Sequence, residues 1–211
     1  MKRVYPLCIL FAALIACDSP EVRRGRDHYE KMCRLCHGAD GEGYLSPRAN
    51  ALTNNEFLVS ATDPFLRVAI TEGRPKTKMS AFGDEFDGPL NNDHVNDLIA
   101  FLRSYQDNLS EALETQWVSL ENNPDLTSGA KLYKKECAKC HGDIGEGGTA
   151  LSLNNPTFLI TASDAYLRYA IEKGRSNTLM LAYEKIFTPQ EITNLVAVIR
   201  GFPNTFGDSY E

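Results

Sequence analysis

Two five-residue motifs have the residue types and spacing for one specific chemistry, the covalent attachment of haem. Residues 33–37 read Cys-Arg-Leu-Cys-His, and residues 137–141 read Cys-Ala-Lys-Cys-His. In a C-x-x-C-H motif both thiols add to one porphyrin, and the histidine binds the iron. A bare C-x-x-C also occurs in redox dithiols and zinc sites, but the adjoining histidine and the duplication favour haem. We therefore expect two covalent haem c groups, with thioethers from Cys33, Cys36, Cys137 and Cys140 and iron ligation by His37 and His141.

Each iron needs an occupant opposite its histidine, and two methionines are candidates. Met79 and Met180 follow the histidines of the two motifs by 42 and 39 residues. Methionine raises the reduction potential and closes the iron, whereas an open position admits a substrate such as peroxide. A lone methionine in a helical protein is more often a core residue. Because these two lie at equivalent places after the motifs, we expect both to be iron ligands. His28 and His94 have no histidine counterpart, and we expect them to be solvated.

Three further residues are candidates to support the haems. A ligating histidine usually donates its Nδ1–H to a carbonyl or carboxylate, and Pro47, ten residues after His37, is placed to supply that carbonyl. No proline follows the second motif at that distance, so we expect the two haems to differ in environment. Arg74 and Arg175 are candidates to pair with haem propionates, because guanidinium pairs well with carboxylate. A plain surface role is the alternative for both arginines.

The chain after residue 21 consists of two similar copies of one sequence. Matching residues are 104 positions apart around the motifs, 101 apart from Phe57 to Met79, and 97 apart near the end. Each copy has about 85–90 residues, which is small for an unaided core, and a covalent haem would supply an apolar centre.

Both copies have the apolar spacing and end signals of helices. Helices are expected directly before the motifs, over 22–33 and 129–137. A further helix is expected to begin at the Asp63-Pro64 cap and to end at Gly73. Each copy is also expected to end in a helix, and in the second copy Thr188 opens it with a capping box. The Gly-, Asn- and Ser-rich stretch before Asp63 is expected to be loop.

The first 17 residues indicate export and anchoring. Lys2-Arg3 is followed by an apolar run from Val4 to Ala16, which predicts a secretory signal and is shorter than the ~20 residues of a membrane-spanning helix. Leu14-Ile15-Ala16-Cys17 resembles the bacterial lipobox, which is cleaved before the cysteine that receives lipid; an ordinary signal peptide is the alternative. Several acyl chains on Cys17 would hold the protein at the membrane outside the cytoplasm, in the periplasm.

With two C-x-x-C-H-G motifs, paired methionines and three helical stretches per copy, the chain resembles tandem di-haem class I c-type cytochromes in a lipoprotein form. The resemblance implies an all-α fold of two tandem cytochrome c-like domains, each wrapped around a covalent haem. We expect a signal peptide over 1–16, domains over 18–106 and 126–211, and a linker over 107–125 that contains Trp117.

The resemblance also implies electron transfer between respiratory or photosynthetic redox partners at the outer face of the bacterial cytoplasmic membrane, with no catalysis. A permanent electron-transfer subunit of a larger membrane oxidoreductase is one alternative. A di-haem peroxidase is another, which the paired methionines disfavour. The formal charge of −6, or about −8 without residues 1–16, argues against nucleic acid as a partner. The expected partners are redox proteins or membrane respiratory complexes, and no small-molecule substrate is expected.

Overall fold

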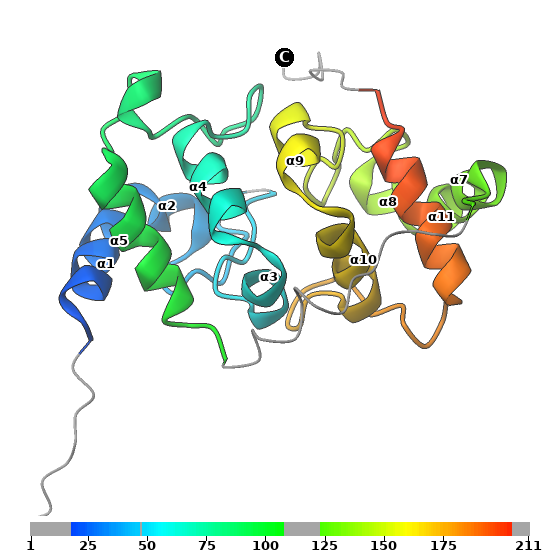
Figure 1. Cartoon of the computed structure of the whole chain (residues 1–211), viewed down its shortest axis with the longest axis horizontal. Coiled ribbons are helices and arrows are strands. Elements are labelled where there is room, and N and C mark those ends of the chain that lie inside the picture. The colour runs from blue at the N-terminus through cyan, green and yellow to red at the C-terminus, as the bar shows by residue number, and fades with distance from the viewer. Residues whose placement is uncertain (1–17, 47, 108–122, 204–211) are drawn as a thin grey trace, which may run out of the picture.

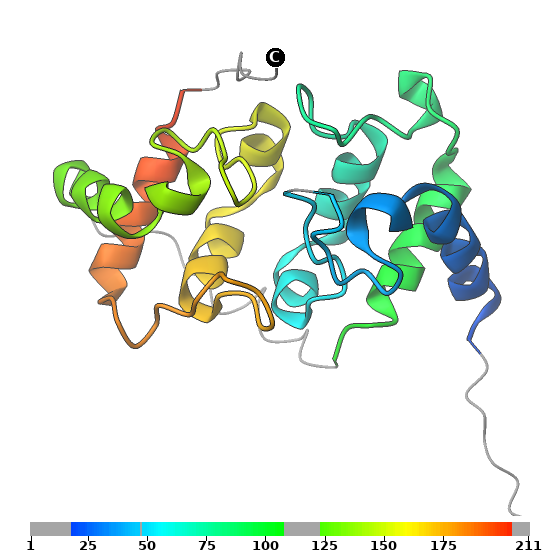
Figure 2. The same cartoon turned by 180° about the vertical axis from the view of Figure 1, so that it is seen from behind.

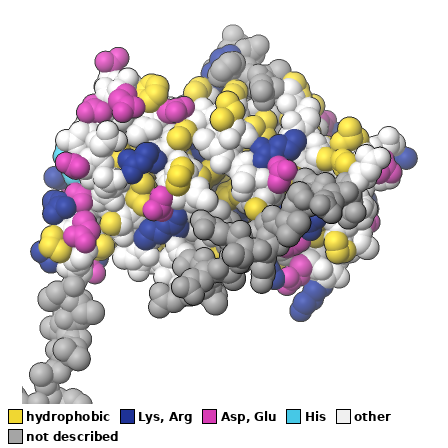
Figure 3. All heavy atoms as spheres, in the orientation of Figure 1, with side chains coloured by type: hydrophobic (Ala, Val, Ile, Leu, Met, Phe, Trp, Pro, Cys, Tyr) yellow, Lys and Arg dark blue, Asp and Glu magenta, His cyan; other side chains and the backbone are white. Residues whose placement is uncertain are grey.

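The computed structural model describes residues 18–46, 48–107 and 123–203. In these ranges the regular structure is helical, with one isolated β-bridge between Gly83 and Leu90. The helices form two groups that lie side by side (Figures 1 and 2): α1–α5, called unit 1, and α7–α11, called unit 2. The expected all-α fold of two tandem units is confirmed. The face drawn in Figure 3 mixes basic, acidic and hydrophobic side chains.

The two units contain the same succession of helices. Unit 1 consists of α1 Pro20–Met32, α2 Arg34–His37, α3 Asn55–Ser60, α4 Asp63–Thr71, a 3-10 turn Asp84–Phe86, and α5 Asn92–Arg103. Unit 2 consists of α7 Leu126–Glu136, α8 Ala138–His141, α9 Pro156–Thr161, α10 Asp164–Lys173 and α11 Pro189–Arg200. None of the helices in the described ranges has the length and apolar character needed to cross a bilayer.

The first and last helices of each unit cross in close contact, and a repeated glycine permits the crossing. A Cβ on Gly25 of α1 would lie 1.9 Å from the carbonyl oxygen of Asp97 in α5. A Cβ on Gly129 of α7 would lie 2.6 Å from the carbonyl oxygen of Asn194 in α11. Because any side chain would push the helices apart, glycine recurs at this position in both copies.

An arginine ties the end of the last helix to the turn between the two middle helices. Arg103 of α5 donates to Asp63 Oδ1 at 2.9 Å and to the carbonyl oxygens of Leu58 and Ala61. Arg200 of α11 makes the same three contacts with Asp164, Leu159 and Ala162. The arginine therefore supplies partners for two carbonyls at the end of a short helix, which the helix itself leaves unpaired.

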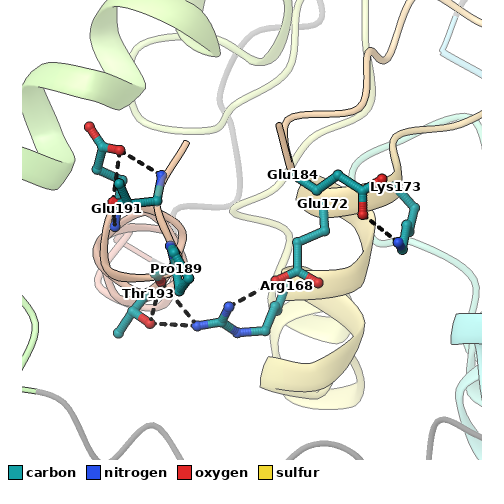
Figure 4. Close-up of polar contacts among 8 residues, drawn as sticks. Arg168, Glu172, Lys173, Glu184, Pro189, Glu191 and Thr193 are labelled. Atoms are coloured by element: carbon teal, nitrogen blue, oxygen red, sulfur yellow. Dashed lines mark hydrogen bonds and ion pairs between the residues drawn. The ribbon is translucent and has the colours of Figure 1, made fainter. Parts of the chain in front are cut away.

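Arg168 joins α10 to α11 in unit 2, as Figure 4 shows. Its guanidinium pairs with Glu172 at 2.8 Å on its own helix. It also donates to Thr193 Oγ1 at 2.5 Å and to the carbonyl oxygen of Pro189 at 3.3 Å. One planar side chain thus fixes the angle between the two helices.

The structure contains the helices expected before the motifs, after Thr62 and at the end of each copy. α1 and α7 begin two and three residues before the expected starts. The capping box of α11 is confirmed, because Glu191 N donates to Thr188 Oγ1 at 3.2 Å and Thr188 N donates to Glu191 Oε2 at 2.8 Å.

Two local expectations were wrong. The cap of α4 is Thr62, whose hydroxyl accepts from Phe65 N, and Asp63 is instead the first helical residue. The stretch before Asp63 is not entirely loop, because it contains α3, with Asn54 as its cap. A helix of six residues has too weak a periodic signal to be recognised from sequence.

The two units meet through their middle helices. α3 packs on α10 and α4 packs on α9, and these two contacts are equivalent under the repeat. At the centre Phe65 of α4 stacks on Tyr166 of α10, with ring centroids 4.9 Å apart. These two residues are themselves repeat partners, so the units are related by an approximate two-fold axis through the stacked rings.

Candidate haem-binding sites

Each C-x-x-C-H motif forms a short helical turn directly after a longer helix. In unit 1, Cys33 N donates to the carbonyl oxygen of Tyr29 at 2.8 Å, and His37 N donates to that of Cys33 at 3.0 Å. The same distances, 2.8 and 3.0 Å, recur for Cys137 and His141 in unit 2. Residues i, i+3 and i+4 of a helix share one face, so the two thiols and the imidazole of each motif lie together.

A buried tyrosine holds the end of each motif. Tyr29 Oη donates to the carbonyl oxygen of Gly38 at 2.8 Å, and Tyr133 Oη donates to that of Gly142 at 2.9 Å. Both tyrosines are almost fully buried. Burial raises the pKa of each phenol, so both remain donors over the physiological range. This contact explains why tyrosine recurs four residues before each motif.

The two motif histidines are oriented in the same way. His37 Nδ1 lies 2.9 Å from the carbonyl oxygen of Asn50, and His141 Nδ1 lies 2.9 Å from that of Leu151. A carbonyl only accepts, so Nδ1 carries the proton and Nε2 keeps the lone pair that a metal requires. Burial lowers the pKa of both histidines, which favours the neutral form that binds metal.

The acceptor for His37 differs from the one expected. The sequence prediction assigned it to Pro47, which lies outside the described residues; the acceptor in the structure is Asn50. Asn50 and Leu151 are 101 positions apart and therefore equivalent under the repeat. The missing proline in unit 2 does not change how the motif histidine is held, because a backbone carbonyl accepts from both histidines; that the two haems differ in environment stays a prediction.

The four motif cysteines are half-buried and form no disulfide. Their thiols are therefore available to form thioethers with a haem. Burial raises the pKa of Cys33 and of Cys137 to about 11. The thiols are therefore neutral and sit at the edge of the apolar core, which both cysteines contact. Together with the free Nε2 of each histidine, this donor set fits a covalently attached haem in each unit.

Met79 and Met180 lie at the ends of two loops of the same build, residues 74–79 and 175–180, here called the methionine loops. Arg74 N donates to the carbonyl oxygen of Met79 at 2.7 Å, and Arg175 N donates to that of Met180 at 2.9 Å. Both methionines are half-buried. Inside each loop a threonine, Thr77 or Thr178, accepts from the methionine N–H and donates to the arginine carbonyl.

A glycine with positive φ directly precedes each methionine loop. Gly73 has φ 66° and Gly174 has φ 64°, a region that favours glycine. A Cβ at either position would lie 2.5 Å from the methionine carbonyl oxygen. The repeated Gly-Arg pair therefore shapes the loop as well as ending the preceding helix.

In unit 2 the chain after the methionine loop returns to the haem motif. Tyr183 lies three residues after Met180 and packs against the same core as Cys137. Burial raises the pKa of Tyr183, and Cys137, Glu136 and Cys140 add to the effect. The two motif cysteines are therefore within electrostatic reach of the segment that follows Met180.

Arg74 and Arg175 lie at the junction between the units. The Arg74 guanidinium lies over the Phe65 ring, 5.4 Å from its centroid, and that of Arg175 lies over the Tyr166 ring at 5.5 Å. Burial lowers the pKa of Arg74 to about 10. No carboxylate pairs with either arginine among the described residues, so both remain candidates for haem propionates.

His28 and His94 lie at the surface of unit 1, where each is partly exposed. Both are half-buried, and their rings face each other across α1 and α5 with centroids 4.4 Å apart. They line a surface hollow together with Arg24, Asn91 and Asp97. His94 Nδ1 also accepts from Asn91 N at 3.4 Å, in a capping box at the start of α5.

Sequence reasoning missed several residues that shape the sites. They are the histidine acceptors Asn50 and Leu151, the loop threonines Thr77 and Thr178, and the helix caps Asn54 and Asn155. The members of each pair are 101 positions apart, so they are equivalent under the repeat. Cys17 and Trp117, like Pro47, lie outside the described residues.

Two helical units, each combining a C-x-x-C-H turn, a fixed histidine and a methionine loop, define a di-haem c-type cytochrome. Residues 20–102 and 124–199 match the family model for cytochrome c oxidase, cbb3-type, subunit III. The chain belongs to this family and carries two covalently bound haem c groups.

Curated relatives point to the same family. The chain is 25% identical over 193 residues to the cbb3-type cytochrome c oxidase subunit CcoP of Azospirillum sp. (strain B510), covering 83% of this chain and 60% of that protein. It is 27% identical over 187 residues to the subunit FixP of Bradyrhizobium diazoefficiens, covering 83% and 59%. The chain thus spans about three-fifths of the length of these relatives.

A solved structure supports the fold. A chain of the Kuenenia stuttgartiensis reducing HAO-like protein complex Kustc0457/Kustc0458 superposes with a TM-score of 0.51, covering 88% of this chain and 99% of its own length. At 21% identity the likeness concerns the arrangement of helices alone.

Proposed function

We propose that this protein is an electron-transfer subunit of a membrane-bound oxidase of the cbb3 kind, handling electrons through two haems and catalysing no reaction of its own. The relatives that cover most of this chain are named as subunits of such an oxidase, which favours a permanent subunit over a mobile carrier. The observation that carries electron transfer is the pairing, in both units, of a fixed motif histidine with a methionine loop.

The ligand set follows from that pairing. Cys33 and Cys36 hold the first haem, with His37 and Met79 on its iron. Cys137, Cys140, His141 and Met180 do the same for the second haem. The haem supplies one-electron chemistry, and the chain supplies two protein ligands that leave no open position for a substrate. We retain the boundaries expected from the sequence, 18–106 and 126–211, as part of this proposal.

Carbon monoxide tests the closed iron. Two irons that are each held by histidine and methionine should leave the spectrum of the reduced protein unchanged when the gas is added. A shift of the haem bands would indicate an open iron and favour the di-haem peroxidase alternative.

Extraction in mild detergent tests the subunit assignment. A tagged chain expressed in its own host should bring down the other subunits of a membrane oxidoreductase, identified by mass spectrometry. Recovery of the chain alone, with full haem content, would favour the mobile carrier between respiratory or photosynthetic partners.

Cys17 anchors the mature chain by lipid at the periplasmic side of the membrane. This assignment rests on the Leu-Ile-Ala-Cys sequence after an apolar run. Cys17→Ser should move the protein from the membrane to the soluble periplasmic fraction; retention at the membrane would contradict the anchor. Cys8→Ser, inside the apolar run, is the matched control and should change nothing.

A further inference from the structure

Each methionine loop is held by the other unit. Asn54 of unit 1 donates from Nδ2 to the carbonyl oxygen of Ser176 at 2.9 Å, in the loop that carries Met180. Asn155 of unit 2 donates from Nδ2 to the carbonyl oxygen of Pro75 at 3.1 Å, in the loop that carries Met79. The two contacts are equivalent under the repeat, so the approximate two-fold axis relates them.

The side-chain amides of these two asparagines are held in a fixed orientation. Asn54 Oδ1 caps α3 by accepting from Phe57 N at 2.9 Å, and Asn155 Oδ1 caps α9 by accepting from Phe158 N at 3.1 Å. Both side chains are at least nine-tenths buried. Because the oxygen is fixed by the helix, the amide nitrogen is aimed across the junction at the other unit's loop.

Unit 1 makes a contact with the Met180 loop that unit 2 does not make with the Met79 loop. Glu56 Oε2 of unit 1 accepts from both Ser176 N at 3.2 Å and Ser176 Oγ at 2.8 Å. The reverse contact is absent for a chemical reason. Thr157 stands at the position equivalent to Glu56, and Pro75, equivalent to Ser176, has no N–H to donate.

Two further contacts hold the second loop. Arg175 donates to Ser60 Oγ of unit 1 at 3.4 Å. On the far side, Lys173 and Glu184 form an ion pair that brackets residues 174–183 (Figure 4). Glu72 and Gly83 occupy the equivalent places in unit 1 and cannot pair in this way.

We propose that Asn54 and Glu56 of unit 1 are positioning residues for Met180 of unit 2, so that methionine ligation of the second haem depends on the first unit. The reverse dependence, of Met79 on Asn155, is weaker. The physical basis is entropic: a loop whose backbone is already fixed loses little freedom when its methionine binds iron, and competes better against an added ligand. The inference rests on the methionine ligation proposed above.

The test measures how easily imidazole displaces each methionine in the oxidised holoprotein. Loss of the sulfur-to-iron charge-transfer band reports the displacement. A Met79→His background leaves the band of the second haem alone, and a Met180→His background leaves that of the first.

In the Met79→His background, Glu56→Gln and Asn54→Ser should each increase the apparent affinity for imidazole several-fold. Serine keeps the helix cap and removes the amide donor, so Asn54→Ser does not depend on loss of α3. In the Met180→His background, Asn155→Ser should give a smaller increase and Glu56→Gln none. Thr157→Ala is the matched control and should affect neither haem.

Three results would overturn the proposal. Unchanged imidazole affinity of the second haem in both Glu56→Gln and Asn54→Ser would show that the bracing has no effect on ligation. Equal shifts at both haems would indicate general destabilisation instead of a directed contact. Absence of the charge-transfer band from the parent protein would remove the methionine ligation itself, and the inference with it.

Discussion

At the scale of single residues, the chain fixes its chemistry through backbone groups. Both motif histidines donate to a main-chain carbonyl, and the residues that supply it, Asn50 and Leu151, have unrelated side chains. The motif tyrosines also donate to main-chain carbonyls. The two sites therefore share one geometry although much of the sequence around them has diverged.

The methionine assignment predicts the potentials. Met79→His or Met180→His should lower the reduction potential of the corresponding haem by an amount on the order of 0.1 V, since methionine favours the reduced iron and axial ligands span about 0.8 V. A redox titration of the holoprotein measures both haems. Met32→Leu alters a methionine that packs against the core beside the first motif, and it should leave both reduction potentials unchanged. Unchanged potentials in the histidine variants would rule out ligation by these methionines.

Removing one buried hydroxyl should weaken each site. Tyr29→Phe or Tyr133→Phe leaves the carbonyl of Gly38 or Gly142 without its partner and should reduce the free energy of unfolding by about 1 kcal/mol. Denaturant unfolding of the holoprotein measures the loss. Tyr105→Phe, at a more exposed position, is the control and should be nearly neutral. Equal effects at all three positions would contradict the role of the hydrogen bond.

Many features of the fold and of the haem sites could be predicted from the sequence, and those that could not were missed for identifiable physical reasons. The motifs, the repeat and the Thr188 capping box are encoded by side-chain type and spacing, and such features are visible in sequence. The acceptor for His37 is a backbone carbonyl, which every residue possesses, so no residue type marks it. Asn54 and Glu56 act across the junction between the units, and their partners lie more than 100 positions away.

At the scale of elements, tertiary contacts stabilise two short helices that would not form alone. α3 and α9 have six residues each, too few to be stable alone. Each begins at an asparagine cap, buries a phenylalanine, and ends where Arg103 or Arg200 binds its carbonyls. The helices that join the two units therefore form only when the longer helices around them are in place.

The capping box of α11 predicts a response of the protein's stability to acid. The N–H of Thr188, and then its hydroxyl, hold the pKa of Glu191 below its ordinary value. A lowered pKa means that this contribution to stability is present above the ordinary value of about 4.3 and is lost as pH falls through the lowered one. Glu191→Gln should remove that part of the acid dependence. Melting temperature against pH measures it.

A control variant makes the acid test specific. Glu30→Gln, on the exposed face of α1, should leave the acid dependence of the wild type intact. A Glu191→Gln variant with the full acid dependence of the wild type would show that the box does not contribute.

At the scale of the whole molecule, the two units behave as an internal dimer. Two equivalent helix contacts, α3 with α10 and α4 with α9, form the junction, and the equivalent side chains Phe65 and Tyr166 stack on the axis. The symmetry is broken at Glu56 and Ser176, whose contact has no counterpart. We therefore expect one unfolding transition for the wild-type protein and unequal consequences when the junction is weakened from either side.

The stacked rings allow the coupling between units to be measured. Phe65→Leu and Tyr166→Leu should each destabilise the protein, and the double variant should lose about 1 kcal/mol less than the two losses together, because an aromatic pair contributes that much beyond burial. Phe65→Leu with Tyr183→Leu, whose rings make no contact, should be additive. Calorimetry of the Phe65/Tyr166 double variant should also show the single transition begin to separate into two. Strict additivity for the stacked pair, with one transition retained, would mean that polar contacts across the junction, such as those of Asn54, Asn155 and Glu56, couple the two haem units without a contribution from the rings.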